Sequence, residues 1–204
     1  MRRRPRRAQS PRHRRIAERD GALLRSAHEE DLPAIDALTV ICYRPIQESY
    51  VALLGEECHE AVRHDPELGW EERKTRQNRD LYEQHPDWVW VLEASGEVFG
   101  FVTFWLVPEK SYGHLDNNGV HPSRAGQGWA TFMYRHALRH FREQGLRFAH
   151  VDTGLDDAHI PARRAYEAVG FDRPVPGVEY WQDLTVGNPA SGLEGRRGRP
   201  AHES

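Results

Sequence analysis

A glycine-containing segment at residues 120–130 constrains the fold more than any other part of this 204-residue chain. Residues 113–120 before it have the character of a strand, and residues 129–144 after it repeat apolar side chains at helical spacing. Between them, Gly126 and Gly128 permit a tight turn that bares backbone N–H groups. Such groups bind anions when they lie at the start of a helix. The segment therefore predicts a phosphate site, although glycines also serve ordinary turns.

A second segment, residues 150–171, narrows this prediction. It has a strand end, an acidic turn, a short helix with Pro161 in its first turn, and a Gly-Phe stop. Together the two segments resemble the GNAT superfamily of acyl-CoA N-acyltransferases. The residues that match the family motifs are Val120, Pro122, Gly126, Gly128 and Ala130 in the first segment, and Ala162, Tyr166, Gly170 and Phe171 in the second. The resemblance covers roughly residues 88–185, and the spacing of the two motifs is also that of the family.

The chain departs from the family pattern at three positions. Ala125 stands where the family usually has Arg or Gln, His159 replaces the usual Asn, and Ala165 replaces the usual Leu. The change at Ala125 removes one expected contact with the pyrophosphate. Because the backbone of the turn supplies most of that contact, we still expect the cofactor to bind. Alternative sources of charge or hydrogen bonds are Arg124, Gln127 and Arg163.

The resemblance implies acetyl-CoA as the acyl donor and direct attack by a primary amine, without a covalent enzyme intermediate. It makes the Val120 N–H the donor that holds the oxyanion, and it pairs the backbone of Asn118 and Val120 with the pantetheine arm. The residues that it assigns to cofactor binding are Asn118, Val120, Ala125, Gly126, Gln127, Gly128, Trp129, Ala130, His159 and Arg163.

Tyr166 is the candidate acid that protonates the departing thiolate, because the family often uses a tyrosine at this motif position. A phenol can donate a proton to sulfur. The alternative is an aromatic side chain that packs under the cofactor.

His114 and Asp116 are the candidate bases. Strict alternation along the strand places both on one face with Asn118 and Val120. His114 lies where some histone-acetylating members carry a glutamate base, and an imidazole titrates near neutrality. Both side chains could instead be hydrogen-bonding groups that shape the strand. Two further carboxylates, Asp152 and Asp156, are additional options for the base, but turn or cap formation is the favoured interpretation of both.

The order of elements predicts a single α/β domain with a mixed, largely antiparallel, twisted sheet flanked by helices. The expected strands are residues 22–25, 88–94, 97–107, 113–120, 147–152 and 178–184. The expected helices begin near residue 31 and then cover residues 47–64, 71–84, 129–144 and 161–168.

Charge and composition set the domain limits. Residues 1–19 hold nine arginines and one glutamate, and we expect a disordered leader there. A disordered tail is expected at residues 187–204, which leaves residues 20–186 as the acyltransferase domain. The arginine-rich arm could contact nucleic acid, but an arm without a partner is the favoured interpretation. The acidic remainder of the chain suits a cationic amine.

No run of about 18 apolar residues exists, so we expect no membrane span and no membrane partner. Cys42 and Cys58 are few and are expected to be reduced thiols, which indicates a cytoplasmic protein. His136 and His140 are four residues apart, but without a third ligand they predict a solvated helix face and no metal.

The sequence thus predicts an acetyl-CoA-dependent N-acetyltransferase that acts on a small-molecule or protein amine. A homodimer is left open. Two alternatives remain: a non-catalytic acyl-CoA-binding regulatory module, which Ala125 and His159 motivate, and a nucleic-acid-associated protein that uses the arginine arm.

Overall fold

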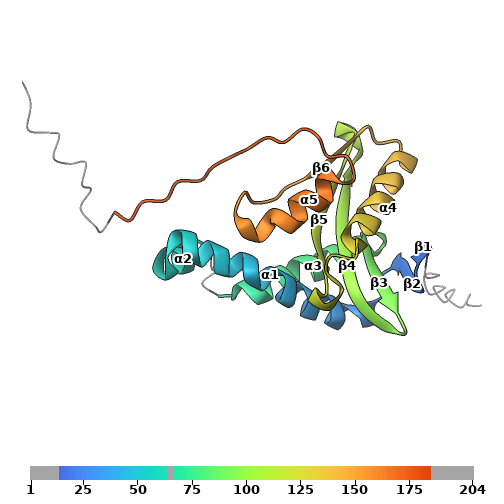
Figure 1. Cartoon of the computed structure of the whole chain (residues 1–204), viewed down its shortest axis with the longest axis horizontal. Coiled ribbons are helices and arrows are strands. Elements are labelled where there is room, and N and C mark those ends of the chain that lie inside the picture. Colours follow the sequence, from blue (N-terminus) through green and yellow to red (C-terminus); the bar gives the residue numbers. More distant parts are fainter. Residues whose placement is uncertain (1–13, 64–66, 185–204) are drawn as a thin grey trace, which may run out of the picture.

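The computed structural model describes residues 14–63 and 67–184. In it, six strands form one sheet and lie side by side in the order in which they occur along the chain (Figure 1). The strands are β1 (Arg15–Arg19), β2 (Ala22–Ser26), β3 (Val89–Ala94), β4 (Glu97–Val107), β5 (Tyr112–Val120) and β6 (Phe148–Val151). Every neighbouring pair is antiparallel except β5 and β6, which are parallel. The expected mixed, largely antiparallel sheet is confirmed.

The α-helices of the described residues are α1 (Leu32–Leu54), α2 (Glu56–Arg63), α3 (Trp70–Gln84), α4 (Trp129–Glu143) and α5 (Ile160–Glu167). Phe104 of β4 packs with Met133 and Phe141 of α4, whereas Phe101 packs with Ile35 of α1. Because side chains alternate along a strand, α4 and α1 lie on opposite faces of the sheet. No helix in this part of the chain is long and apolar enough to cross a membrane.

A β-bulge interrupts β5 in its middle. The register with β4 shifts between Val102 and Phe104, so that Asp116 and Asn117 together lie opposite Thr103. An extra residue in a strand reverses the alternation of every side chain beyond it. The bulge therefore divides β5 into two halves whose side chains are out of phase.

The bulge overturns the expected shared face of the strand. His114 stacks on Trp105, the neighbour of Phe104, and so lies on the face opposite α4. Asn118 instead contacts Tyr134 of α4 and Tyr166 of α5, and Val120 packs into the same α4 core. The prediction that His114 and Asp116 share one face with Asn118 and Val120 is wrong, because the alternation on which it relied is broken at Asp116.

The two ends of the described chain correct the expected domain limits. Residues 15–19, assigned to the disordered leader, form β1 and pair with β2. The expected last strand at residues 178–184 is absent, since these residues have no ladder partner and leave Tyr180 and Leu184 exposed. Residues 1–13 and 185–204, which include the whole of the expected tail at 187–204, lie outside the described residues.

Two helical expectations also change. One helix, α1, continues through Pro45 to Leu54, where the sequence predicted a separate helix from residue 47. On α4, His140 is buried against Trp90 and Phe104 and does not lie on a solvated face. Burial lowers the pKa of His140, with a smaller contribution from Arg14, which favours a neutral aromatic ring within the core.

Candidate active site

An open cleft of about 1950 Å³ lies where β5 and β6 diverge. The parallel pairing of these strands ends at Leu115 and Val151, so the second half of β5 has no partner on that side among the described strands. The cleft is bordered by α1, β5, the start of α4, and α5. Of the predicted site residues, those lining it are His114, Asp116, Asn118, Val120, Ala125, Gly126, Gly128, Trp129, Ala130, His159 and Tyr166.

The glycine turn has the geometry expected of an anion site. Gly126 and Gly128 have φ angles of 73° and 75°, in the left-handed region where a side chain is strained. The turn leads directly into α4, whose first backbone N–H groups have no partner within the helix. With the positive end of the helix dipole, these N–H groups suit a phosphate.

Arg19 of β1 supports this turn from outside the cleft. Its guanidinium donates to the carbonyls of Gln127 (2.9 Å) and Gly128 (3.1 Å). The same group lies 3.6 Å from the ring centroid of Trp129, a cation–π contact. Arg19 therefore orients the turn by holding its carbonyls away from the cleft, a role that the sequence prediction missed.

Gln127 and Arg163, which were predicted to contact the cofactor, do not line the cleft. Gln127 accepts a hydrogen bond from the Trp129 indole (3.1 Å). Arg163 donates to the carbonyls of Gly154 (2.6 Å) and Asp156 (2.9 Å), and thereby closes the turn before α5. Both side chains are used for local structure.

His159 reaches the cleft but is also tied to this turn. Its Nδ1 lies 2.5 Å from Oδ1 of Asp156, whose Oδ2 accepts a hydrogen bond from Ser49 of α1 (2.7 Å). Burial would raise the pKa of Asp156, but Ser49 and His159 outweigh it, so the pKa is lowered. Arg124 lies over the Phe99 ring and borders the cleft, where it offers the positive charge that Ala125 lacks.

The backbone of β5 offers hydrogen-bonding groups to the cleft. The His121 N–H donates to the Phe99 carbonyl (2.8 Å), so the adjacent Val120 belongs to a pair that exchanges no ladder hydrogen bonds. The Val120 N–H therefore points away from β4, toward the gap between β5 and β6. The Asn118 N–H points the same way and donates to the Tyr43 hydroxyl (3.4 Å).

Tyr166 is buried and belongs to a polar network. Its hydroxyl accepts a hydrogen bond from Asn118 Nδ2 (3.2 Å), and Asn118 Oδ1 accepts one from Tyr134 (2.5 Å). Burial raises the pKa of Tyr166, and contacts with Asn118 and Tyr134 offset this only in part. The phenol therefore stays protonated at neutral pH and has its own hydrogen left to donate.

A second polar network lies beneath the opposite wall of the cleft. The Tyr43 hydroxyl and Lys74 Nζ both donate to Asn117 Oδ1 (3.0 Å each), and Asn117 Nδ2 donates to Asn78 (3.0 Å). Burial lowers the pKa of Lys74, while Asp116 acts against this shift. The network fixes side chains of α1 and α3 against the bulge in β5.

The two candidate bases lie in different settings. Asp116 accepts a hydrogen bond from Thr103 (3.3 Å) within the bulge. His114 is buried beside Trp105 and approaches His150 of β6, which the sequence prediction missed. Burial lowers the pKa of His114 and His150 lowers it further, so that the imidazole is neutral at physiological pH.

A sequence model of the Acetyltransferase (GNAT) family matches residues 55–171, which is more than half of the chain. The chain belongs to this family. The match begins directly after α1 and ends at Phe171, so it includes both motif segments, and it confirms the resemblance that they carry. The fold of solved GNAT structures supports the same assignment.

Among curated proteins, the chain is 27% identical over 161 residues to a mycothiol acetyltransferase from Thermomonospora curvata. The alignment covers 76% of this chain and 52% of the relative, so the chain spans about half of that protein's length.

Among solved structures, a GNAT acetyltransferase from Brucella melitensis in complex with acetyl-CoA matches with a TM-score of 0.50 and 20% identity. The match covers 74% of this chain and 83% of that one. The ribosomal-protein-S18-alanine N-acetyltransferase from Escherichia coli matches with a TM-score of 0.50 and 16% identity, over 76% and 79% of the two chains. These likenesses establish the GNAT fold.

Proposed function

We propose that this GNAT protein transfers the acetyl group of acetyl-CoA to a primary amine in the cleft between β5 and β6. The single observation that carries the proposal is the convergence of unpaired backbone donors on one cleft: the N–H groups of the glycine turn and the N–H of Val120. The first group suits a pyrophosphate, and the second suits the oxygen of a thioester that gains negative charge.

In this proposal, Gly126 to Ala130 hold the pyrophosphate and Arg124 adds positive charge. Val120 stabilises the oxyanion, and Asn118 can pair with the pantetheine arm if the Tyr43 hydroxyl releases its N–H. Tyr166 protonates the departing thiolate, which its raised pKa and its free hydrogen support. His114 accepts a proton from the amine.

The acceptor is proposed only as an amine. Solved relatives include an AAC(6')-Iy in complex with a bisubstrate analogue and the S18-alanine N-acetyltransferase, so both small molecules and protein termini belong in a screen. The acidic charge balance of the domain favours a cationic acceptor.

The test combines binding and turnover. Isothermal titration with acetyl-CoA measures the cofactor site, and release of free thiol measures transfer to amino sugars, polyamines, amino acid esters and peptide N-termini. We expect binding and acetyl-CoA-dependent turnover of at least one acceptor class. Binding without turnover on any acceptor would instead support a regulatory module.

Tyr166→Phe tests the proposed acid. It removes the donating hydroxyl but keeps the ring against Tyr134 and Phe171. We expect kcat to fall about 10- to 100-fold, with the Kd of acetyl-CoA changed less than threefold. Tyr112→Phe, on β5 outside the cleft, is the matched control. Unchanged kcat in Tyr166→Phe would remove the acid role and leave only a packing role.

A further inference from the structure

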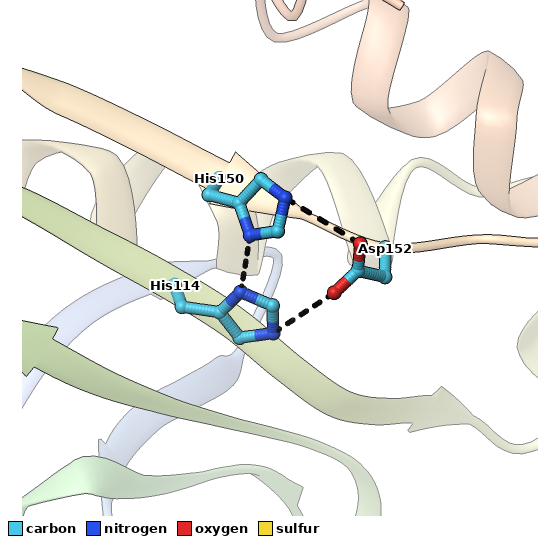
Figure 2. A group of neighbouring side chains, drawn as sticks. All are labelled: His114, His150 and Asp152. Atoms are coloured by element: carbon cyan, nitrogen blue, oxygen red, sulfur yellow. Dashed lines mark hydrogen bonds and ion pairs between the residues drawn. The ribbon is translucent and has the colours of Figure 1, made fainter. Parts of the chain in front are cut away.

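His114, His150 and Asp152 meet where β5 and β6 begin to diverge, at one end of the cleft (Figure 2). His114 and His150 are direct partners in the parallel ladder. Their Nδ1 atoms are 2.7 Å apart, and His150 Nε2 lies 3.4 Å from Asp152 Oδ1. His114 Nε2 lies 4.0 Å from Asp152 Oδ2, so the three side chains form a closed ring of contacts.

The contact between the two imidazoles fixes how protons are shared. A nitrogen pair at 2.7 Å needs one proton, because a neutral imidazole has one donor and one acceptor nitrogen. Asp152, which only accepts, draws the proton of His150 to Nε2 and leaves His150 Nδ1 as an acceptor. The shared proton then belongs to His114 Nδ1, and the lone pair of His114 is on Nε2.

The same three groups have the composition of a metal site, but their spacing favours hydrogen bonding. Two nitrogen ligands on a tetrahedral zinc ion, each at about 2.0 Å from it, would be about 3.3 Å apart. The 2.7 Å separation of the Nδ1 atoms is shorter than this and falls in the range of a hydrogen bond. The two histidines are thus hydrogen-bonded to each other through their Nδ1 atoms.

We propose that His150 and Asp152 hold His114 in the tautomer that can act as a base, and that His114 Nε2 and Asp152 Oδ2 bind the acceptor as its ammonium ion. The inference rests on the proposed acetyl transfer and assigns its acceptor subsite. An ammonium donates hydrogen bonds in several directions, and these two atoms are its acceptors. Asp152 is 80% exposed, so its carboxylate can adjust to an incoming ligand.

The protons balance in this scheme. The bound ammonium gives one proton to His114 Nε2, and the lone pair that this frees forms the bond from nitrogen to the acyl carbon. The bond from carbon to sulfur breaks, and the thiolate takes a proton from Tyr166. The nitrogen loses its second proton as the amide forms, which restores the Tyr166 hydroxyl through solvent. His114 releases its proton at the exposed edge formed by His150 and Asp152.

His114 is suited to this cycle by its surroundings. The groups facing it are Trp105 from β4, Asp116 from β5, His150 from β6 and Asp152 beyond β6. Burial and His150 lower the pKa of His114, whereas Asp116 and Asp152 raise it. The side chain is therefore neutral before the acceptor arrives, and the two carboxylates stabilise the imidazolium that then forms.

A spectroscopic test needs no turnover. Long-range proton–nitrogen correlation spectra of the full chain, with assignment from His114→Gln and His150→Gln, report which nitrogen of each ring carries hydrogen. We expect Nδ1–H on His114 and Nε2–H on His150. The opposite tautomer of His114 would overturn the inference even if the protein acetylates amines. If the tautomers are as expected but the protein acetylates no amine, the proposed function and the acceptor subsite that rests on it are both overturned.

A kinetic test separates positioning by His150 from structural support. With the best amine of the screen, we expect His150→Ala to lower kcat/KM about 100-fold and to move its acidic limb to higher pH, since His150 lowers the pKa of His114. His150→Gln, whose amide oxygen can accept from His114 Nδ1, is expected to stay within about fivefold of wild type. Equal losses in both variants would contradict control of the tautomer.

Two further measurements complete the test. Asp152→Asn should raise the KM of the amine about tenfold and leave the Kd of acetyl-CoA unchanged, because it removes the charge that holds the ammonium and helps to stabilise the His114 imidazolium, while its amide oxygen can still accept from His150. His136→Ala, on the side of α4 away from the cleft, is the matched control and should behave as wild type. Stoichiometric, His150-dependent binding of Zn²⁺ that stimulates turnover would overturn the inference in favour of a metal site.

Discussion

The proposed acetyl-CoA side of the cleft is built mainly from backbone, whereas the proposed acceptor side is built from side chains. On the proposed acetyl-CoA side, the glycine turn and Val120 present N–H groups that the fold itself positions. On the proposed acceptor side, His114 and Lys74 are held by hydrogen bonds to side chains of other elements, His150 and Asn117. A backbone site depends on a few glycines and one helix start, while a side-chain site depends on many tertiary contacts.

The largest expected effect is at the glycine turn. Gly126→Val forces a side chain into the left-handed region, at a cost of about 1–2 kcal/mol, and covers N–H groups needed for the phosphate. We expect the Kd of acetyl-CoA, measured by isothermal titration, to rise about 100-fold. Gly145→Val places the same strain (φ 76°) at the other end of α4, outside the cleft, and is the control. Equal weakening in both variants would show that strain alone is responsible.

An intermediate effect is expected at the support of the turn. Arg19→Ala removes two hydrogen bonds to turn carbonyls and the contact with Trp129, so the turn should lose its fixed orientation. We expect acetyl-CoA to bind about tenfold more weakly. Arg15→Ala, on the same strand, removes an exposed ion pair with Glu18 and should bind as wild type. If Arg19→Ala also binds normally, the proposed acetyl-CoA side does not depend on side-chain support.

The smallest expected effect is at Lys74, which borders the cleft on the proposed acceptor side. Lys74→Met removes a positive charge close to Asp116, so that a cationic amine meets a more negative cleft. We expect its KM to fall about threefold at low salt, with no change in the Kd of acetyl-CoA. The difference should disappear at high ionic strength because screening weakens it. Lys110→Met, which changes the only other lysine, is the control. A change in acetyl-CoA affinity would mean that the two sides are not separable.

The same contrast explains what the sequence could predict. Gly126, Gly128 and the helical repeat after them lie within one short segment, so local spacing was enough to predict the strand, the turn and α4. The hairpin of β3 and β4 was predicted for the same reason, since Ser95 and Gly96 lie directly between its strands.

Tertiary pairing carries the features that the sequence could not reveal. His150 reaches His114 only because β6 pairs with β5 in one parallel register. The contact of Arg19 with the glycine turn could not be predicted, because Arg19 is one of nine arginines in a segment whose composition indicated disorder. The bulge at Asp116 and Asn117 cannot be recognised from the sequence of β5, because a strand with one extra residue has no distinctive pattern of polar and apolar residues here.

The bulge in β5 has a consequence for the geometry of the proposed reaction. His114 precedes it and lies on the sheet face opposite α4, while Asn118 follows it and directs Tyr166 from the face of α4 and α5. In the proposed scheme the amine therefore approaches the flat thioester from one side, and sulfur departs toward the other. The one additional residue in β5 would then cause the tetrahedral intermediate to form with a single configuration at the acyl carbon. That carbon is not a stereocentre in either the thioester or the amide.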